Sequence, residues 1–214
     1  MIEDLTAFFI RPVELVAHYR TILLFLVCPS LGALGAWLIA GTAFRERLLD
    51  VPNQRSSHIV PTPRGAGVGI LAAFVFAGLT LRIPTTFLFA AILISAISCY
   101  SDYFRVSVRF RLVVQVLSTL ILLFPLLPRL SAHFSQSALG GYPFLFLLVL
   151  AAIFLFIIGT ANFYNFMDGI DGIAGLSGVI GFGLLGVCSL YRAVPDSFQT
   201  PLSLLAICVS LACL

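Results

Sequence analysis

The sequence predicts an all-α fold, a polytopic bundle of membrane-spanning helices. Hydrophobic residues make up 60% of its 214 residues, charged residues make up 10%, and the mean hydropathy is +1.10. A typical water-soluble domain has about 45–50% apolar and about 25% charged residues. Long apolar segments also recur along the whole chain. These observations exclude an ordinary soluble globular protein and indicate a single membrane domain over residues 1–214.

The length of each apolar segment decides whether it can be predicted to span the membrane. A bilayer has about 30 Å of hydrocarbon and a helix rises about 1.5 Å per residue, so a span needs about 20 residues, or about 17 at the lower limit. The predicted segments are Thr21–Thr42, Gly67–Leu81, Thr85–Tyr100, Leu112–Leu127, Tyr142–Ala161, Ile173–Tyr191 and Pro201–Leu214. The second and third only just qualify, and the last reaches only about 21 Å as a helix. We therefore expect about six complete spans and a truncated seventh.

The polar connections predict the topology. Because successive spans alternate in direction, the connections after the first, third and fifth spans lie on one face of the membrane. All twelve basic residues are arginines, and seven of them fall in these three connections. Arginine-rich loops favour the cytoplasm, so we expect this face to be cytoplasmic and read the charge as topology rather than as a nucleic-acid site. The other connections, including Pro128–Gly141, are expected to be short loops.

The connection after the fifth span reads NFYNFMDGIDG. Asn162, Asn165, Asp168 and Asp171 recur in it every three residues, and no arginine or lysine occurs at positions 130–191. In a helix such residues form one slowly drifting stripe. Carboxylate and amide oxygens without a local cation are ligands that Mg²⁺ accepts, usually together with substrate phosphates. The alternative is capping of helix ends by Asn and Asp.

The other two connections on this face also carry polar groups. The first reads DVPNQRSSHIVPTPRGAG, residues 50–67, and its arginine, serine and histidine side chains and glycine amides offer donors to a phosphate. Its alternative interpretation is a positively charged topology loop. The second, residues 101–112, places Asp102 at the membrane edge beside Arg105, Arg109 and Arg111. An intramolecular ion pair is the alternative account of that carboxylate.

Three stretches together resemble a known family in their order and spacing. They are DVPNQRSSHIVPTPRGAG, the segment from Asp102 to Gln115 that ends in SVRFRLVVQ, and NFYNFMDGIDGIAG. The chain resembles the polyprenyl-phosphate N-acetylhexosamine-1-phosphate transferases of glycosyltransferase family 4, which include the cell-wall phospho-N-acetylmuramoyl-pentapeptide transferase. The resemblance covers residues 50 to about 178, and implies the N-terminal part of the family's fold. The first connection looks more like the branch that starts O-antigen or related glycans.

The resemblance implies a multi-pass enzyme of the bacterial inner membrane that uses Mg²⁺, with Mn²⁺ as an alternative ion. Polyprenyl (undecaprenyl) phosphate would attack the sugar phosphate of a UDP-N-acetylhexosamine at the cytoplasmic face. The products would be a polyprenyl-diphospho-sugar and UMP. Such a reaction initiates the synthesis of O-antigen, and hence lipopolysaccharide, or of another cell-envelope glycan.

The resemblance also implies roles for individual residues. Asn165 and Asp168 would lie at the metal and the diphosphate. Asp102 matches the second residue of the family's Asp-Asp pair, which is associated with the lipid phosphate nucleophile, so Asp102 and Asp168 are the catalytic candidates. The remaining assigned residues would bind substrate. They are Gly169, Ile170 and Asp171 in the uridine pocket and Arg55, Ser57 and His58 on the phosphate-binding surface.

Two departures from the family open a second interpretation. Ser101 stands where the family usually has the first aspartate. The family also continues into further spans with a Phe-Met-Gly-Asp segment and a histidine-bearing loop, so we expect this chain to be truncated at its C-terminus relative to the family. The alternative is a truncated, catalytically inactive protein that retains at most lipid or nucleotide binding, and a transporter comes third. The sequence leaves the sugar, the prenyl length and a homodimer open.

Overall fold

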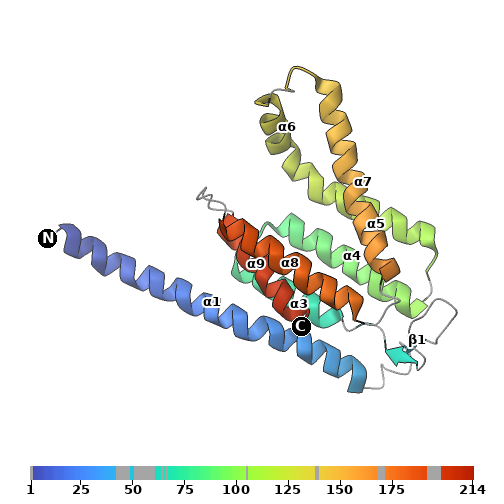
Figure 1. Ribbon diagram of the computed structural model, residues 1–214, viewed down its shortest axis with the longest axis horizontal. Coiled ribbons are helices and arrows are strands. Elements are labelled where there is room, and N and C mark those ends of the chain that lie inside the picture. Colours follow the sequence, from blue (N-terminus) through green and yellow to red (C-terminus); the bar gives the residue numbers. More distant parts are fainter. Residues whose placement is uncertain are drawn as a thin grey trace. The chain divides into compact units, whose positions relative to one another are not determined.

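The computed structural model describes residues 2–41, 49–50, 61–63, 65, 67–104, 106–137, 140–167, 172–191 and 199–214. These residues are helical apart from turns and one short two-stranded ladder (Figure 1). The predicted all-α class is confirmed at this level. The chain forms two compact units, which are described separately. That residues 1–214 act as a single membrane domain stays a prediction.

Several helical segments in the described residues are long and apolar enough to cross a membrane. They are His18–Gly41, Val108–Ser135, Pro143–Tyr164 and Ile173–Leu190. Shorter apolar helical segments are Gly67–Thr80, Thr85–Ser101 and Pro201–Ala212. These lengths and compositions indicate a multi-pass membrane protein. They do not confirm the predicted count of six complete spans and a truncated seventh.

Unit 1 comprises Met1–Arg45, Gly65–Ile83 and Gly175–Leu214. Its core lies where three helices meet, and it is lined by small or slender side chains such as Leu24, Cys28, Ala73 and Cys208, none of which is exposed. Small residues let membrane helices approach closely and gain dispersion contacts. The three helices are α1 (Ile2–Gly41), α3 (Gly67–Thr80) and α9 (Gln199–Ala212).

A fourth helix of unit 1, α8 (Ile173–Tyr191), runs beside α9 in Figure 1. A Cβ added at Gly178 would lie 2.8 Å from Sγ of Cys213, just beyond the end of α9. The hydroxyl of Ser210 donates a 2.8 Å hydrogen bond to the carbonyl oxygen of Val179. The absence of a side chain at Gly178 thus lets the end of α9 approach α8 closely.

Unit 2 comprises Glu46–Arg64 and Pro84–Ala174, ranges that include the Asp102–Gln115 segment, NFYNFMDGIDG and the first segment as far as Arg64. Its central helix is α5, which packs against both α4 and α7. Its elements are β1 (Leu49–Asp50), β2 (Thr62–Pro63), α4 (Thr85–Phe104), α5 (Val108–Leu123), the 3₁₀ turn η1 (Phe124–Leu126), α6 (Leu127–Ser135) and α7 (Pro143–Met167).

The connection between α4 and α5 is shorter than predicted. α5 starts at Val108 rather than near Leu112, which places Arg111 on a helix. Ser107 has extended dihedral angles, and its hydroxyl accepts a 3.4 Å hydrogen bond from the backbone N–H of Phe110. A serine that satisfies an amide of the first helical turn is a favourable N-cap. The serine therefore fixes the start of the helix ahead of the apolar run.

The connection Pro128–Gly141 is not the plain loop that the sequence predicted. The turn η1 leads directly into α6, and each carries a proline, Pro125 or Pro128, in its first turn. A proline is tolerated there because the missing N–H would have no helical partner. His133 consequently lies in the last turn of α6 rather than on a loop.

The described start of the third motif, NFYNFMDGIDG, is helical. Asn162 and Asn165 lie near the end of α7, whereas Asp168 and Asp171 lie outside the described residues. Gly172 has a φ of +73°, the left-handed region that glycine adopts readily, and α8 begins at the next residue. The backbone of the two asparagines is therefore helical, and the predicted stripe of polar side chains stays a prediction.

The first motif begins and ends in a short ladder that the sequence did not predict. β1 pairs antiparallel with β2, with Asp50 opposite Thr62, and so brings the two ends of this segment together. Pro63 has no N–H to donate, which suits a two-stranded ladder with open edges. Residues 51–60 lie outside the described residues.

Candidate functional site

The C-terminal end of α4 is tied to the first turn of α5. Nη2 of Arg111 donates a 3.1 Å hydrogen bond to Oγ of Ser101, a residue only 6% exposed. Nε of Arg111 is also buried, and no described residue accepts a hydrogen bond from it. A buried donor without an acceptor costs about 1–3 kcal/mol, and more when the group is charged. This end of unit 2 therefore presents an unsatisfied cationic donor close in sequence to Asp102.

Helix α5 is also joined to the start of the third motif, NFYNFMDGIDG. Nδ2 of Asn162 donates 2.9 Å hydrogen bonds to Oε1 of Gln115 and to the carbonyl oxygen of Ile158 in its own helix. Gln115 is only 5% exposed. Because few polar partners exist inside a helical membrane bundle, such interhelical bonds fix how two helices face each other. The bond therefore holds the motif-bearing end of α7 against α5.

Both links start from one buried polar face of α5. Arg111 and Gln115 are four residues apart and so lie on the same side of the helix. Ser118 and Thr119 extend this side and are fully buried. The hydroxyl of Thr119 donates to the carbonyl oxygen of Gln115 at 2.8 Å, whereas Oγ of Ser118 has no partner in the described part of the chain. Gln115 was not among the predicted site residues, because only its contact with Asn162 on α7 distinguishes it from the apolar residues around it.

The predicted site residues are only partly described. Asp102 follows Ser101 on α4, and Asn165 lies three residues after Asn162 on α7, but nothing is described of either side chain. The other predicted site residues lie outside the described residues. They are Arg55, Ser57, His58, Asp168, Gly169, Ile170 and Asp171. The roles assigned to all these residues stay predictions.

The donor set suits an anion. Within the described ranges, no group of three His, Cys, Asp or Glu side chains could hold a metal ion, and this statement does not cover Asp168 or Asp171. The buried Nε of Arg111 is a donor that a phosphate oxygen could satisfy. The Mg²⁺ requirement and anion binding at Arg111 both stay predictions.

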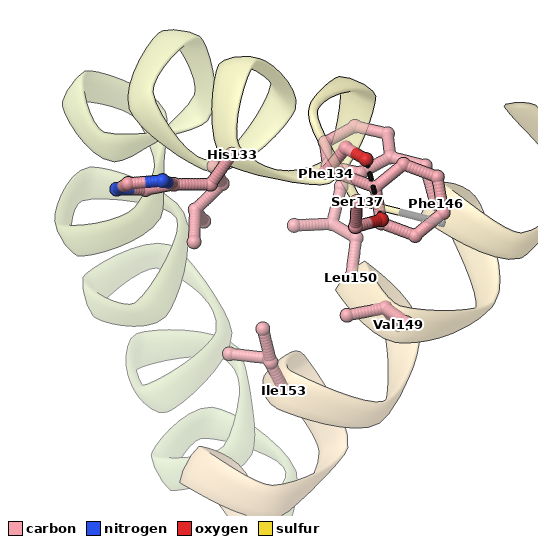
Figure 2. A pocket seen from close by; sticks show the side chains of 8 residues that line it. His133, Phe134, Ser137, Phe146, Val149, Leu150 and Ile153 are labelled. Atoms are coloured by element: carbon pink, nitrogen blue, oxygen red, sulfur yellow. Dashed lines mark hydrogen bonds between the residues drawn. The ribbon is translucent and has the colours of Figure 1, made fainter. Parts of the chain in front are cut away.

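A cavity of unit 2 lies away from these links, between α6 and α7 (Figure 2). Its lining runs from Leu130 to Ile153 and includes none of the predicted site residues. The links to α4 and to the third motif involve the start of α5 and the end of α7, whereas the cavity lies near the opposite ends of these helices. The cavity is therefore separate from the candidate site.

Comparison with known proteins identifies the family. The sequence model described as glycosyl transferase family 4 matches residues 84–214, well over half of the chain. The chain belongs to glycosyl transferase family 4. No curated protein and no solved structure matches it. The matched region includes α4, α5 and α7, so both hydrogen-bonded links lie within the glycosyl transferase family 4 region.

Membership in glycosyl transferase family 4 confirms the resemblance and gives the general class of protein. The family supports a phosphoglycosyl transferase that acts at a membrane between a sugar nucleotide and a lipid phosphate. The segment DVPNQRSSHIVPTPRGAG precedes the matched residues. That the chain corresponds to the N-terminal part of the family's fold stays a prediction.

Proposed function

We propose that this protein transfers N-acetylhexosamine-1-phosphate from a UDP-sugar to polyprenyl (undecaprenyl) phosphate at the cytoplasmic face of the bacterial inner membrane. An oxygen of the lipid phosphate attacks the β-phosphorus of the UDP-sugar. The bond from that phosphorus to the oxygen bridging it to the α-phosphate breaks, and UMP leaves. The polyprenyl-diphospho-sugar then starts O-antigen or another cell-envelope glycan.

One observation carries the proposal, namely that α5 joins the α4 segment to the third motif. Ser101 next to Asp102 is bound by Arg111, and one turn later Gln115 is bound by Asn162. Two segments that are about 60 residues apart in the chain are thus held by one helix face. A lipid phosphate and a nucleotide diphosphate must meet at one place, so this arrangement supports a common site.

Each site residue has a separate role in the proposed reaction. Arg111 donates to a phosphate oxygen, as guanidinium groups do with high geometric specificity. Asp102 positions the lipid phosphate, and Asn165 with Asp168 holds Mg²⁺ or Mn²⁺. When bound, such an ion neutralises charge that develops on the diphosphate. The uridine and the phosphates are bound by Gly169, Ile170, Asp171, Arg55, Ser57 and His58.

We also propose the number of spans and the side of the membrane on which the motif segments lie. Six spans and a short seventh helical segment would place all three motif segments at the cytoplasmic face. The Ser101–Arg111 and Asn162–Gln115 bonds support this arrangement for the second and third segments, because both involve the first turns of α5. A bacterial inner membrane is proposed on the strength of the family alone.

A second candidate is a protein that binds nucleotide or lipid phosphate without transferring the sugar. The observation that favours it is Ser101, because a hydroxyl engaged by Arg111 stands where the resemblance implies a carboxylate. A site with one acidic group fewer could still bind a phosphate through Arg111. It would be a weaker catalyst, since a positioned acid or base contributes typically about 10²- to 10⁴-fold.

Release of UMP separates the two candidates. Membranes containing the full chain are given UDP-N-acetylglucosamine, undecaprenyl phosphate and Mg²⁺, and membranes without the chain are the control. Transfer predicts UMP release that needs the lipid phosphate and stops with EDTA. If UMP is not released but UDP-N-acetylglucosamine raises the melting temperature of the purified chain, the binding candidate holds. If neither occurs, both candidates are wrong.

A further inference from the structure

The cavity between α6 and α7 has a volume of about 240 Å³. A water molecule in the liquid occupies about 30 Å³, so this volume is several times larger than a single-water packing gap. One wall is a stripe of apolar side chains at helical spacing on α7. These side chains are Phe146, Val149, Leu150 and Ile153 (Figure 2). The stripe runs for about 10 Å along the helix axis.

The opposite wall comes from α6 and the residues after it. Leu130 and Phe134 are apolar, and the ring of Phe134 packs against that of Phe146 with centroids 5.4 Å apart. The hydroxyl of Ser137 donates a 2.6 Å hydrogen bond to the carbonyl oxygen of Phe134, as the dashed line in Figure 2 shows. A space with such walls suits a hydrocarbon chain better than a polar ligand.

The α6 side of the cavity forms a rim with two basic residues nearby: His133 lines the cavity, and Arg129, one turn earlier, does not. Arg129 and His133 are exposed and lie four residues apart on α6, hence on the same side of the helix. Figure 2 shows His133 at the edge of the cavity with its ring turned away from it. No aspartate or glutamate occurs in the sequence at positions 103–167. Within α5, α6 and α7, therefore, no carboxylate is available to neutralise this rim.

The surroundings of the rim indicate a membrane boundary. α6 is a short helix with apolar and polar sides, a pattern typical of helices that lie in the interface plane. Tyr142, just before α7, is 63% exposed, and tyrosine is enriched where a membrane meets water. Arginine near such a surface attracts anionic lipid headgroups. An apolar groove below a basic rim thus matches the two parts of one lipid molecule.

We propose that this cavity binds one acyl chain of an anionic phospholipid from the surrounding bilayer, with the lipid phosphate at Arg129 and His133. The guanidinium supplies charge and donors, and the imidazole supplies an N–H donor in either protonation state. The site lies near the ends of α5 and α7 opposite to Ser101 and Asn162. It is therefore independent of the proposed transfer reaction.

Photolabelling in vesicles tests the site. The full chain is reconstituted in phosphatidylcholine that contains a small fraction of phosphatidylglycerol with a diazirine on one acyl chain, and labelled positions are mapped by mass spectrometry. We expect labels to concentrate on the cavity stripe of α7. Ile153→Trp fills the cavity and should remove most of them. Leu155→Trp on the same helix, where Leu155 is 67% exposed and does not line the cavity, should leave them unchanged.

A second variant tests whether the lipid headgroup binds at Arg129. Arg129→Gln removes one surface cation and should reduce labelling by about fivefold. Arg20→Gln, on an exposed residue of unit 1, should have no effect. Because Arg129 is exposed, this comparison decides the question even if Ile153→Trp does not fold.

Three results would overturn the proposal. Labels spread evenly around α7, or undiminished in a folded Ile153→Trp chain, would show that the cavity holds no acyl chain. Equal labelling by a diazirine phosphatidylcholine would remove the role of the anionic headgroup. Displacement of the lipid by millimolar glycerol phosphate would identify a site for free anions instead of a lipid site.

Discussion

Asn162 of α7 and Gln115 of α5 are joined by a 2.9 Å hydrogen bond from Nδ2 to Oε1. Asn162 is the first residue of NFYNFMDGIDG, and Gln115 is the last residue of SVRFRLVVQ. Two of the stretches that resemble the family are therefore in direct contact. The helix that binds the end of α4 through Arg111 therefore also binds the start of the third motif.

A double-mutant cycle on this pair tests the contact. Asn162→Leu should destabilise the protein, because it leaves the amide oxygen of the buried Gln115 without this donor. Gln115→Leu should cost less, because the exposed Asn162 keeps its bond to the carbonyl oxygen of Ile158. The double variant should cost less than the sum, with a coupling of about 0.6 to 1.7 kcal/mol, the range for interhelical hydrogen bonds in membranes. The measurement is unfolding of the purified protein in detergent. A coupling of zero would mean that the two side chains do not interact.

Ser101 gives a second prediction. Ser101→Ala should lower the free energy of unfolding by about 1–3 kcal/mol, because it leaves another donor of Arg111 without an acceptor. Ser101→Asp supplies a carboxylate and should recover that loss. Ser135→Ala, at an exposed serine of the same unit, should change stability by less than about 0.5 kcal/mol. If Ser101→Asp stabilises an Arg111→Gln chain equally, the arginine is not its partner.

The helices were predictable because long apolar runs are a strong signal, but their ends were not. Arg111 was assigned to a loop because it is charged, although a charged side chain is tolerated on a helix when a neighbouring helix supplies an acceptor, as Ser101 does here. Ser107 was the better boundary signal. α6 was missed because Pro128 was interpreted as a loop residue, whereas a proline in the first turn is compatible with a helix.

The residues of the third motif could be predicted from the sequence, but the residues that contact them could not. The spacing of Asn162 and Asn165 and the family resemblance both singled out the third motif. The partners of the motif depend on tertiary packing, which one sequence does not reveal. Gln115 was overlooked because a lone glutamine in an apolar run carries no motif, and it matters only through the helix that packs beside it. Ser101 was noted as a departure, but its bond to Arg111 needed the structure.

The contact between α8 and α9 predicts opposite effects for two glycines of one helix. A Cβ at Gly186 would lie 2.5 Å from Cγ1 of Ile207 and 3.1 Å from the carbonyl oxygen of Ser203, whereas one at Gly181 would meet nothing within 4 Å. Gly186→Ala should therefore destabilise by about 1–3 kcal/mol through overpacking. Gly181→Ala should be neutral or stabilise by up to about 1 kcal/mol through helix propensity. Thermal unfolding of both variants checks this, and equal melting temperatures would refute the close approach.

Cysteine labelling tests the orientation. In a chain without its five native cysteines, cysteines at His58, Asp102 and Asp168 should resist an impermeant thiol reagent in intact cells and react after permeabilisation. Ser131→Cys on α6 serves as the matched control, because its connection lies on the other face and should react in intact cells. Labelling of the three motif positions without permeabilisation would invert the topology.

Formation of the lipid-linked sugar tests the central claim most directly. Membranes containing the full chain receive labelled UDP-N-acetylglucosamine, undecaprenyl phosphate and Mg²⁺, and the labelled lipid product is quantified. We predict product from the unaltered chain and from Ser131→Ala, and a rate lower by about 10²- to 10⁴-fold for Asp102→Asn and for Asp168→Asn. Rates for both aspartate variants within about twofold of the unaltered chain would contradict the account, because a change that small is far below what losing a catalytic acid or base costs.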